Sequence, residues 1–140
     1  MYNVNKKGLV AAIYARKNKF CKERDIFNVQ EKKCSEYMEG KYGNDVVIKR
    51  YIDDVDRLEM QKLISDIKSG SIQAVCAYKL DRFGRNATDI LNFVRLLEQY
   101  GVNLYCLEDN LCLNFVEKND YMTRLMMCFL SLFAGLEFEE

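Results

Sequence analysis

The sequence predicts an α/β fold in which a mostly parallel sheet of four or five strands is flanked by helices. Short apolar runs alternate with longer segments of helical periodicity along most of the chain, and glycines separate several of them. The 140 residues contain no proline, and no linker or repeat interrupts them. Because 49% of the residues are hydrophobic, the chain can bury a core, and we expect one domain.

The first strand, helix and second strand begin this alternation. The run LVAAIYAR, residues 9–16, is apolar and partly β-branched, which is typical of a strand buried on both faces. A weaker helical pattern covers residues 26–38, and its apolar positions share one side: Phe27, Cys34 and Met38. After Gly43 and Asn44, the run DVVIKRYI, residues 45–52, predicts the second strand.

The second helix and third strand follow. Apolar residues recur at helical spacing from Leu58 to Ile67, and Gly70 is placed to end this helix. The run IQAVCAYKL, residues 72–80, then predicts the third strand.

The third helix has the clearest amphipathic pattern in the chain. It covers TDILNFVRLLEQY, residues 88–100, with Thr88 as the candidate N-cap and Gly101 as the stop signal. The run VNLYCLE, residues 102–108, predicts the fourth strand. We therefore divide the chain into an α/β core, residues 1–119, and a long C-terminal helix, residues 120–140.

This last helix carries apolar side chains on more than one stripe. One stripe can pack on the sheet, and the remainder is exposed unless a second chain covers it. We therefore predict a homodimer or tetramer, with interface residues Leu125, Met126, Phe129, Leu132, Phe133 and Leu136. The alternative is a helix buried wholly in its own domain. The apolar run 125–136 is too short for a membrane span, so no membrane contact is expected.

Composition excludes several kinds of site. The chain has six cysteines without a C-x-x-C pair and no histidine, so neither a metal site nor a disulfide framework is expected. Reduced thiols indicate the cytoplasm, and Cys76, Cys106 and Cys128 are predicted to lie in the core. Lys and Arg together number 21, as do Asp and Glu, so any contact with a polyanion must be local.

Charged side chains gather where the predicted strands end. Ligands of open parallel sheets bind beyond the carboxyl ends of the strands. The first strand ends in Tyr14, Arg16 and Asn18, the second in Asp53 with Arg57 behind it, and the third in Asp81, Arg82 and Arg85. Guanidinium groups match phosphate oxygens, so Arg16, Arg57, Arg82 and Arg85 predict a phosphodiester site oriented by the aspartates. The alternative is an ordinary solvated rim.

These residues resemble the catalytic domain of serine site-specific recombinases, the resolvase/invertase family. IYARKNKF is similar to the Tyr-x-Arg-x-Ser opening strand, and YKLDRFGRN is similar to the Asp-Arg-x-x-Arg signature. Gln30 matches the glutamine of the following helix, Arg57 the next active-site arginine, and MTRLMMCFLSLFAGLEFEE the long dimerisation helix. The resemblance implies metal-free and cofactor-free DNA strand exchange in which a serine becomes joined to a 5′ phosphate.

Three departures from the family pattern predict that cleavage is lost. Asn18 occupies the position of the nucleophile, and a carboxamide cannot form the phosphoester that religation reverses. The connection YIDDVDR lacks the glycine or serine of the family's mobile segment, and Phe138 follows Glu137 where the family carries arginine. No sequence resembling a DNA-binding region follows, so we expect weak DNA binding from this chain alone.

Two other functions remain open. The chain could be an interaction protein that dimerises with an active recombinase through its last helix and regulates it. It could also be a flavodoxin-like nucleotide-binding protein, although nothing like the phosphate loop G-x-G-x-x-G occurs in it.

Overall fold

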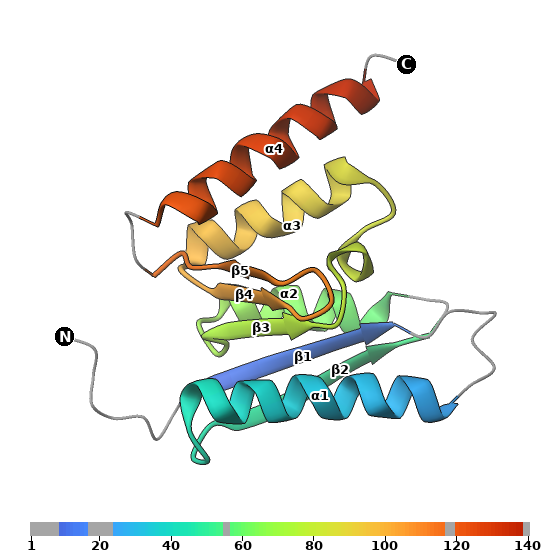
Figure 1. Cartoon of the computed structure of the whole chain (residues 1–140), viewed down its shortest axis with the longest axis vertical. Coiled ribbons are helices and arrows are strands. Elements are labelled where there is room, and N and C mark those ends of the chain that lie inside the picture. The colour runs from blue at the N-terminus through green and yellow to red at the C-terminus, as the bar shows by residue number, and fades with distance from the viewer. Residues whose placement is uncertain (1–8, 17–23, 55–56, 117–119, 139–140) are drawn as a thin grey trace.

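A computed structural model describes residues 9–16, 24–54, 57–116 and 120–138, and it confirms the predicted α/β class (Figure 1). The strands are β1 (Val10–Arg16), β2 (Val47–Asp53), β3 (Ala74–Ala77), β4 (Asn103–Cys106) and β5 (Leu111–Leu113). They form one sheet in the order β2-β1-β3-β4-β5. The neighbouring pairs among β1 to β4 are parallel, and β5 runs antiparallel to β4 at the edge.

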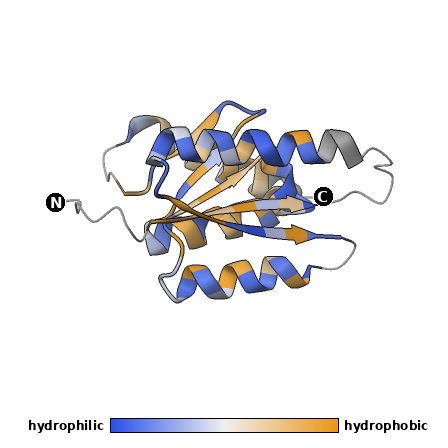
Figure 2. Cartoon of the chain, turned by 90° about the horizontal axis from the view of Figure 1, so that it is seen from below, coloured by the Kyte–Doolittle hydropathy of each residue, from blue (hydrophilic) through white to orange (hydrophobic). Residues whose placement is uncertain are grey.

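Helices cover both faces of this sheet. α1 (Arg24–Tyr42) lies on one face, and α2 (Leu58–Lys68) lies on the other, with the hydrophobic strands between them (Figure 2). α3 (Ala87–Tyr100) shares the side of α2, because their apolar side chains belong to the same core cluster. Along the chain, α1 follows β1 and α2 follows β2, which is the order that the sequence predicts.

The alternation of side chains along β1 explains its continuous apolar sequence. Ala11 and Ile13 pack in the core layer under α1, whereas Ala12 and Tyr14 pack in the layer under α2 and α3. β1 is also flanked by β2 and β3, so it is buried on both faces and paired on both edges.

The third strand is shorter than predicted. β3 ends at Ala77, and Leu80–Phe83 form a short 3-10 helix, η1. The backbone N–H of Leu80 donates to Oδ2 of Asp109 at 2.7 Å, so a carboxylate 29 residues away holds the start of η1. The predicted run of residues 72–80 could not reveal this bond, because its acceptor lies beyond β4.

The N-cap of α3 is Asn86, so the assignment to Thr88 was wrong. The Asn86 side-chain oxygen accepts the backbone N–H of Asp89 at 2.9 Å, and the helix begins at Ala87. Two capping residues lie close together in the sequence, and the turn before the helix selects the earlier one. At the other end Gly101 adopts φ of 66°, which confirms the predicted stop.

The last helix, α4 (Tyr121–Phe138), packs along α3 and the edge strand β5 (Figure 1). Leu130 and Ala134 are buried in this contact, and Met126 is half-buried. Four predicted interface side chains are exposed: Leu125, Phe129, Leu132 and Phe133. Cys128 is also exposed, so its assignment to the core was wrong, because it lies on the side of α4 away from Leu130. Within the described residues, no helix meets the length and apolarity of a membrane span.

Candidate active site

Side chains from β1, α1 and η1 meet at the carboxyl end of the sheet. They surround a small cavity of about 20 Å³, which we call the arginine cavity. Four of the predicted site residues line it: Tyr14, Arg16, Gln30 and Arg82. The sequence did not suggest the other lining residues, which are Ile13, Ala15, Glu31, Cys34 and Tyr78. The fold thus brings together two of the four predicted arginines around one space.

Asp53, at the end of β2, is a buried carboxylate with three donors. Its Oδ2 accepts the Tyr14 hydroxyl at 2.7 Å and the Met60 backbone N–H at 3.0 Å. Its Oδ1 accepts the Glu59 backbone N–H at 2.8 Å. Because these amides belong to the first turn of α2, the carboxylate also lies at the positive end of a helix dipole. Asp53 therefore fixes Tyr14 and α2, whereas the sequence suggested that it would orient an arginine.

Tyr14 is held as a neutral hydrogen-bond donor. Burial, together with the hydrogen bond to Asp53, raises the pKa of the Tyr14 hydroxyl well above its ordinary value of 10.0. The positive charges of Arg16 and Arg57 oppose this rise in the pKa, which places both guanidinium groups within electrostatic reach of the Tyr14 ring. Tyr14 thus connects the arginine cavity with Arg57.

Arg57 contains the most unusual polar atoms of the site. Its Nε and Nη2 are buried, and neither has a hydrogen-bond partner among the described residues. A buried donor without an acceptor costs about 1–3 kcal/mol of stability, and more when the group is charged. Such a guanidinium group is satisfied when an anion supplies the missing oxygens.

Stacked aromatic rings hold η1, the element that carries Arg82. The Phe83 ring stacks on Tyr14 with a centroid distance of 5.6 Å and on Phe93 with a distance of 4.6 Å. The position of Arg82 is therefore set by its neighbour in the sequence. Asp81 is mostly exposed and its carboxylate lies 3.9 Å from the Arg82 guanidinium, which makes a weak surface pair.

Arg85 lies outside the arginine cavity. It is exposed, and its backbone N–H donates to Oδ2 of Asp89 at 3.1 Å. The preceding Gly84 allows this turn to approach α3, because a Cβ there would lie 2.4 Å from the Cβ of Asp89. Arg85 is thus placed on the rim by a close contact that needs glycine.

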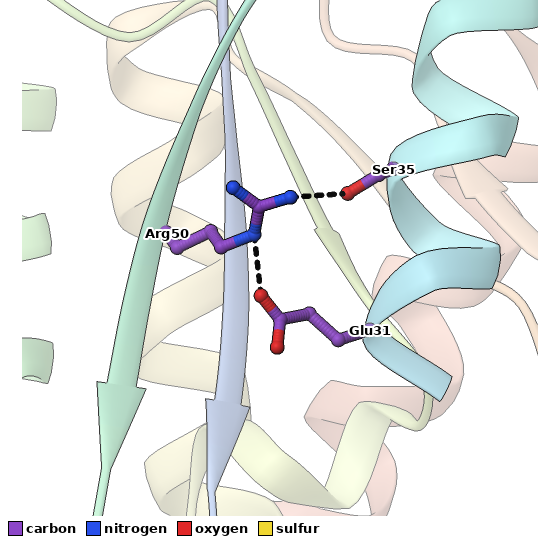
Figure 3. Close-up of polar contacts among 3 residues, drawn as sticks. All are labelled: Glu31, Ser35 and Arg50. Carbon is purple, nitrogen blue, oxygen red and sulfur yellow. Dashed lines mark hydrogen bonds and ion pairs between the residues drawn. The ribbon is translucent and has the colours of Figure 1, made fainter. Parts of the chain in front are cut away.

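A fifth arginine, which the sequence did not suggest, contacts the wall of the site. Arg50 of β2 forms an ion pair with Glu31 of α1, and its Nη2 donates to Ser35 Oγ at 3.4 Å (Figure 3). Glu31 also lines the arginine cavity, so this pair neutralises an acidic group beside it. The four-residue spacing of Glu31 and Ser35 on α1 could have indicated one shared partner.

Asn18 lies outside the described residues, as do the side chains of Leu136 and Phe138. The short connection after β2 is described only at Asp54 and Arg57. Among the described serines, none lines the arginine cavity. What is known of the nucleophile position therefore comes from the sequence alone.

The family model described as "Resolvase, N terminal domain" matches residues 11–140. A resolvase family site-specific recombinase from Streptococcus pneumoniae has a similar structure, with a TM-score of 0.67 and 29% sequence identity. That match covers 94% of this chain and 89% of the other.

The N-terminal catalytic domain of TP901-1 integrase is also similar in fold. Its TM-score is 0.72 at 24% sequence identity, and the match covers 93% of this chain and 97% of that chain. No curated protein sequence matches the chain.

Proposed function

Because the chain belongs to the family of resolvase N-terminal domains, we propose that it is a serine recombinase catalytic domain that binds DNA but does not cleave it. The observation that carries the binding proposal is the half-buried Arg57, whose Nε and Nη2 are buried and have no hydrogen-bond partner in the described structure. A phosphodiester would supply acceptor oxygens to Arg57, Arg16 and Arg82. DNA in the cytoplasm is the expected partner, and no cofactor is required.

The supporting geometry is the convergence on Tyr14. Arg16 and Arg82 line one cavity with the Tyr14 ring, and Arg57 influences the same hydroxyl from the α2 side. Guanidinium groups that surround one phosphate stabilise its negative charge without a metal ion. Arg85, on the rim, and Gln30, on α1, would contact neighbouring phosphates of the DNA backbone.

The loss of cleavage is proposed from Asn18. In this family, a serine alkoxide attacks phosphorus and later leaves again, so the same bond forms and breaks. A carboxamide nitrogen is a poor nucleophile. Asn18 would instead donate a hydrogen bond to a phosphate oxygen, and the DNA strand would stay intact.

Suicide DNA substrates test this proposal. The unchanged chain should form no covalent protein–DNA adduct, whereas Asn18→Ser should form one if the rest of the site is intact. Asn18→Ala is the matched control, because it removes the carboxamide without supplying a hydroxyl. An adduct with the unchanged chain would refute the loss of cleavage, and the absence of any DNA binding would refute the site itself.

A second function is supported by the exposed side of α4. Phe129 is 48% exposed and Leu132 is 64% exposed, although both are large and apolar. Such a surface favours contact with a second copy or with an active recombinase. In this proposal residues 120–140 form the interface and residues 1–119 form the core.

Oligomeric state tests the interface. Replacing Leu125 and Phe129 with glutamate should reduce the mass measured by light scattering to that of a monomer, because charge would enter an apolar contact. Ser131→Glu adds a charge to an exposed position of the same helix and serves as the control. A double variant that assembled like the unchanged chain would exclude this face as the contact.

A further inference from the structure

We propose that Cys34 and Cys76 form an oxidation site, at which a hydroperoxide converts two thiols into a disulfide that closes the arginine cavity. The effect on DNA binding rests on the proposed function, whereas disulfide formation does not depend on it.

The two cysteines face each other between a helix and the sheet. Cys34 lies on α1 and is 2% exposed, and Cys76 lies on β3 and is 0% exposed. Both belong to the core cluster that includes Ala11 and Ile13 of β1, and each thiol shifts the pKa of the other, as neighbouring thiols do. A disulfide between such neighbours requires their Cα atoms to lie within about 7 Å of each other.

The arginine cavity gives an oxidant access to one member of the pair. Cys34 lines this cavity, whose space of about 20 Å³ is enough for one water molecule. Hydrogen peroxide is little larger than water, and it is the smallest hydroperoxide. Cys76 does not line the cavity, so Cys34 is the thiol that reacts first.

The interaction between the two thiols also favours Cys34 as the nucleophile. The neighbouring Cys76 thiol lowers the pKa of Cys34, against the opposing effects of burial and of the Glu31 carboxylate, and Cys34 in turn raises the pKa of Cys76. The thiolate is the reactive form of cysteine, so the pair has one activated sulfur and one that retains its proton.

The reaction balances with one peroxide molecule. The Cys34 thiolate attacks a peroxide oxygen, an S–O bond forms as the O–O bond breaks, and the departing hydroxide takes a proton to become water. The Cys76 sulfur then attacks the resulting sulfenic acid. The S–S bond forms, the S–O bond breaks, and a second water leaves with the Cys76 proton. Two thiols lose two electrons, and the peroxide gains them.

The disulfide changes the wall of the cavity. An S–S bond of about 2.05 Å is shorter than any contact between two unbonded sulfurs, so its closure draws α1 toward β3. Gln30 and Glu31 lie on the turn of α1 before Cys34 and line the same cavity. Because the cavity is so small, a shift of α1 toward β3 would close it, and the phosphate contacts of Arg16 should weaken.

Peptide mapping tests the bond directly. The chain carrying Cys112→Ser and Cys128→Ser, which removes both exposed thiols of the described structure, is treated with hydrogen peroxide and digested with trypsin without reductant. We expect the peptide of residues 34–41 to be linked to that of residues 69–79. Peptides that stay unlinked, or that carry only sulfinic acid, would overturn the proposal without needing any further variant.

DNA binding tests the consequence. Oxidation should weaken binding about tenfold, the effect of losing one hydrogen bond to a charged group, and dithiothreitol should restore it. Cys34→Ser in the same background should bind equally with and without peroxide. Equal binding by the linked and reduced chains would overturn the closing of the cavity. If the reduced chain binds no DNA, the proposed function fails, and the linked peptides still decide the disulfide.

Discussion

Two charged residues of the site, the buried Asp53 and the half-buried Arg57, differ in the hydrogen bonds that the protein gives them. Asp53 receives three hydrogen bonds from the Tyr14 hydroxyl and the first turn of α2. Arg57 follows four residues later, and two of its buried nitrogens receive no acceptor within the described residues. Asp53 therefore belongs to the framework, and Arg57 is the group that an anionic ligand would complete.

Replacing Arg57 should separate stability from binding. Arg57→Met keeps an apolar stem of similar length and removes the unpartnered donors. We therefore expect the free energy of unfolding, measured with urea, to rise by about 1–2 kcal/mol. DNA binding should fall at least tenfold, the effect of losing a hydrogen bond to a charged group. Arg95→Met, on the exposed side of α3, should alter neither quantity. A destabilised Arg57→Met would indicate that the guanidinium is already satisfied.

Tyr14 should influence stability at high pH. Its pKa is raised in the folded state by burial and by Asp53, so above about pH 10, the ordinary tyrosine value, the unfolded chain loses a proton that the folded chain keeps. The folded state then binds more protons, and stability falls as pH rises. Tyr14→Phe should make this fall shallower between pH 9 and 11, as measured by urea unfolding. Tyr121→Phe, at a mostly exposed position, should leave the slope unchanged.

The short helix η1 is held by contacts with other elements of the fold. Asp109 binds its first amide, Phe83 stacks between β1 and α3, and Gly84 allows its exit past Asp89. These contacts fix a four-residue segment that is too short to be stable by its own hydrogen bonds. The position of Arg82 therefore depends on packing rather than on helix propensity.

The close approach at Gly84 can be tested by adding one methyl group. Gly84→Ala should lower the free energy of unfolding by about 1–3 kcal/mol, because its Cβ would overlap the backbone and Cβ of α3. Gly40→Ala is the matched control, since nothing lies within 4 Å of its Cβ on α1. That control should raise stability by about 0.5–1 kcal/mol through helix propensity. A stable Gly84→Ala would show that η1 can move away.

At the scale of the whole molecule, positive and negative charges are equal in number but unevenly distributed. The formal net charge is zero, yet arginines from β1, η1 and the start of α2 lie at one end of the sheet. A neutral protein gains little long-range attraction to DNA, so the proposed DNA binding would depend on contacts at this end. The exposed apolar side of α4 belongs to a helix that carries none of these arginines. This side and the arginine end of the sheet can therefore be used at the same time.

The salt dependence of DNA binding should measure this local charge. If Arg16, Arg57 and Arg82 each neutralise one phosphate, the logarithm of the binding constant should fall with the logarithm of salt concentration with a slope of about −3. Arg16→Ala should reduce the magnitude of the slope by about one, whatever the DNA sequence. Lys62→Ala, at an exposed position of α2, is the control. A slope that Arg16→Ala leaves unchanged would place Arg16 on the solvated rim.

The sequence by itself determined the α/β class, the order of helices and parallel strands, and the ends of α2 and α3 near Gly70 and Gly101. Hydrophobic periodicity and glycine conformation are local properties, so they can be read without knowing which segments meet. The apolar excess of α4 was predictable for the same reason, because its sequence has more apolar positions than one neighbour can cover.

Only the tertiary structure decided the rest. The cap at Asn86, the start of η1 at Asp109 and the bonding of Asp53 to Tyr14 depend on which partners the fold brings within reach. The side of α4 that meets α3 likewise determines that Leu130 is buried and Cys128 exposed. A hydrogen bond or a packed face needs two segments, and the sequence of one segment does not contain the position of the other.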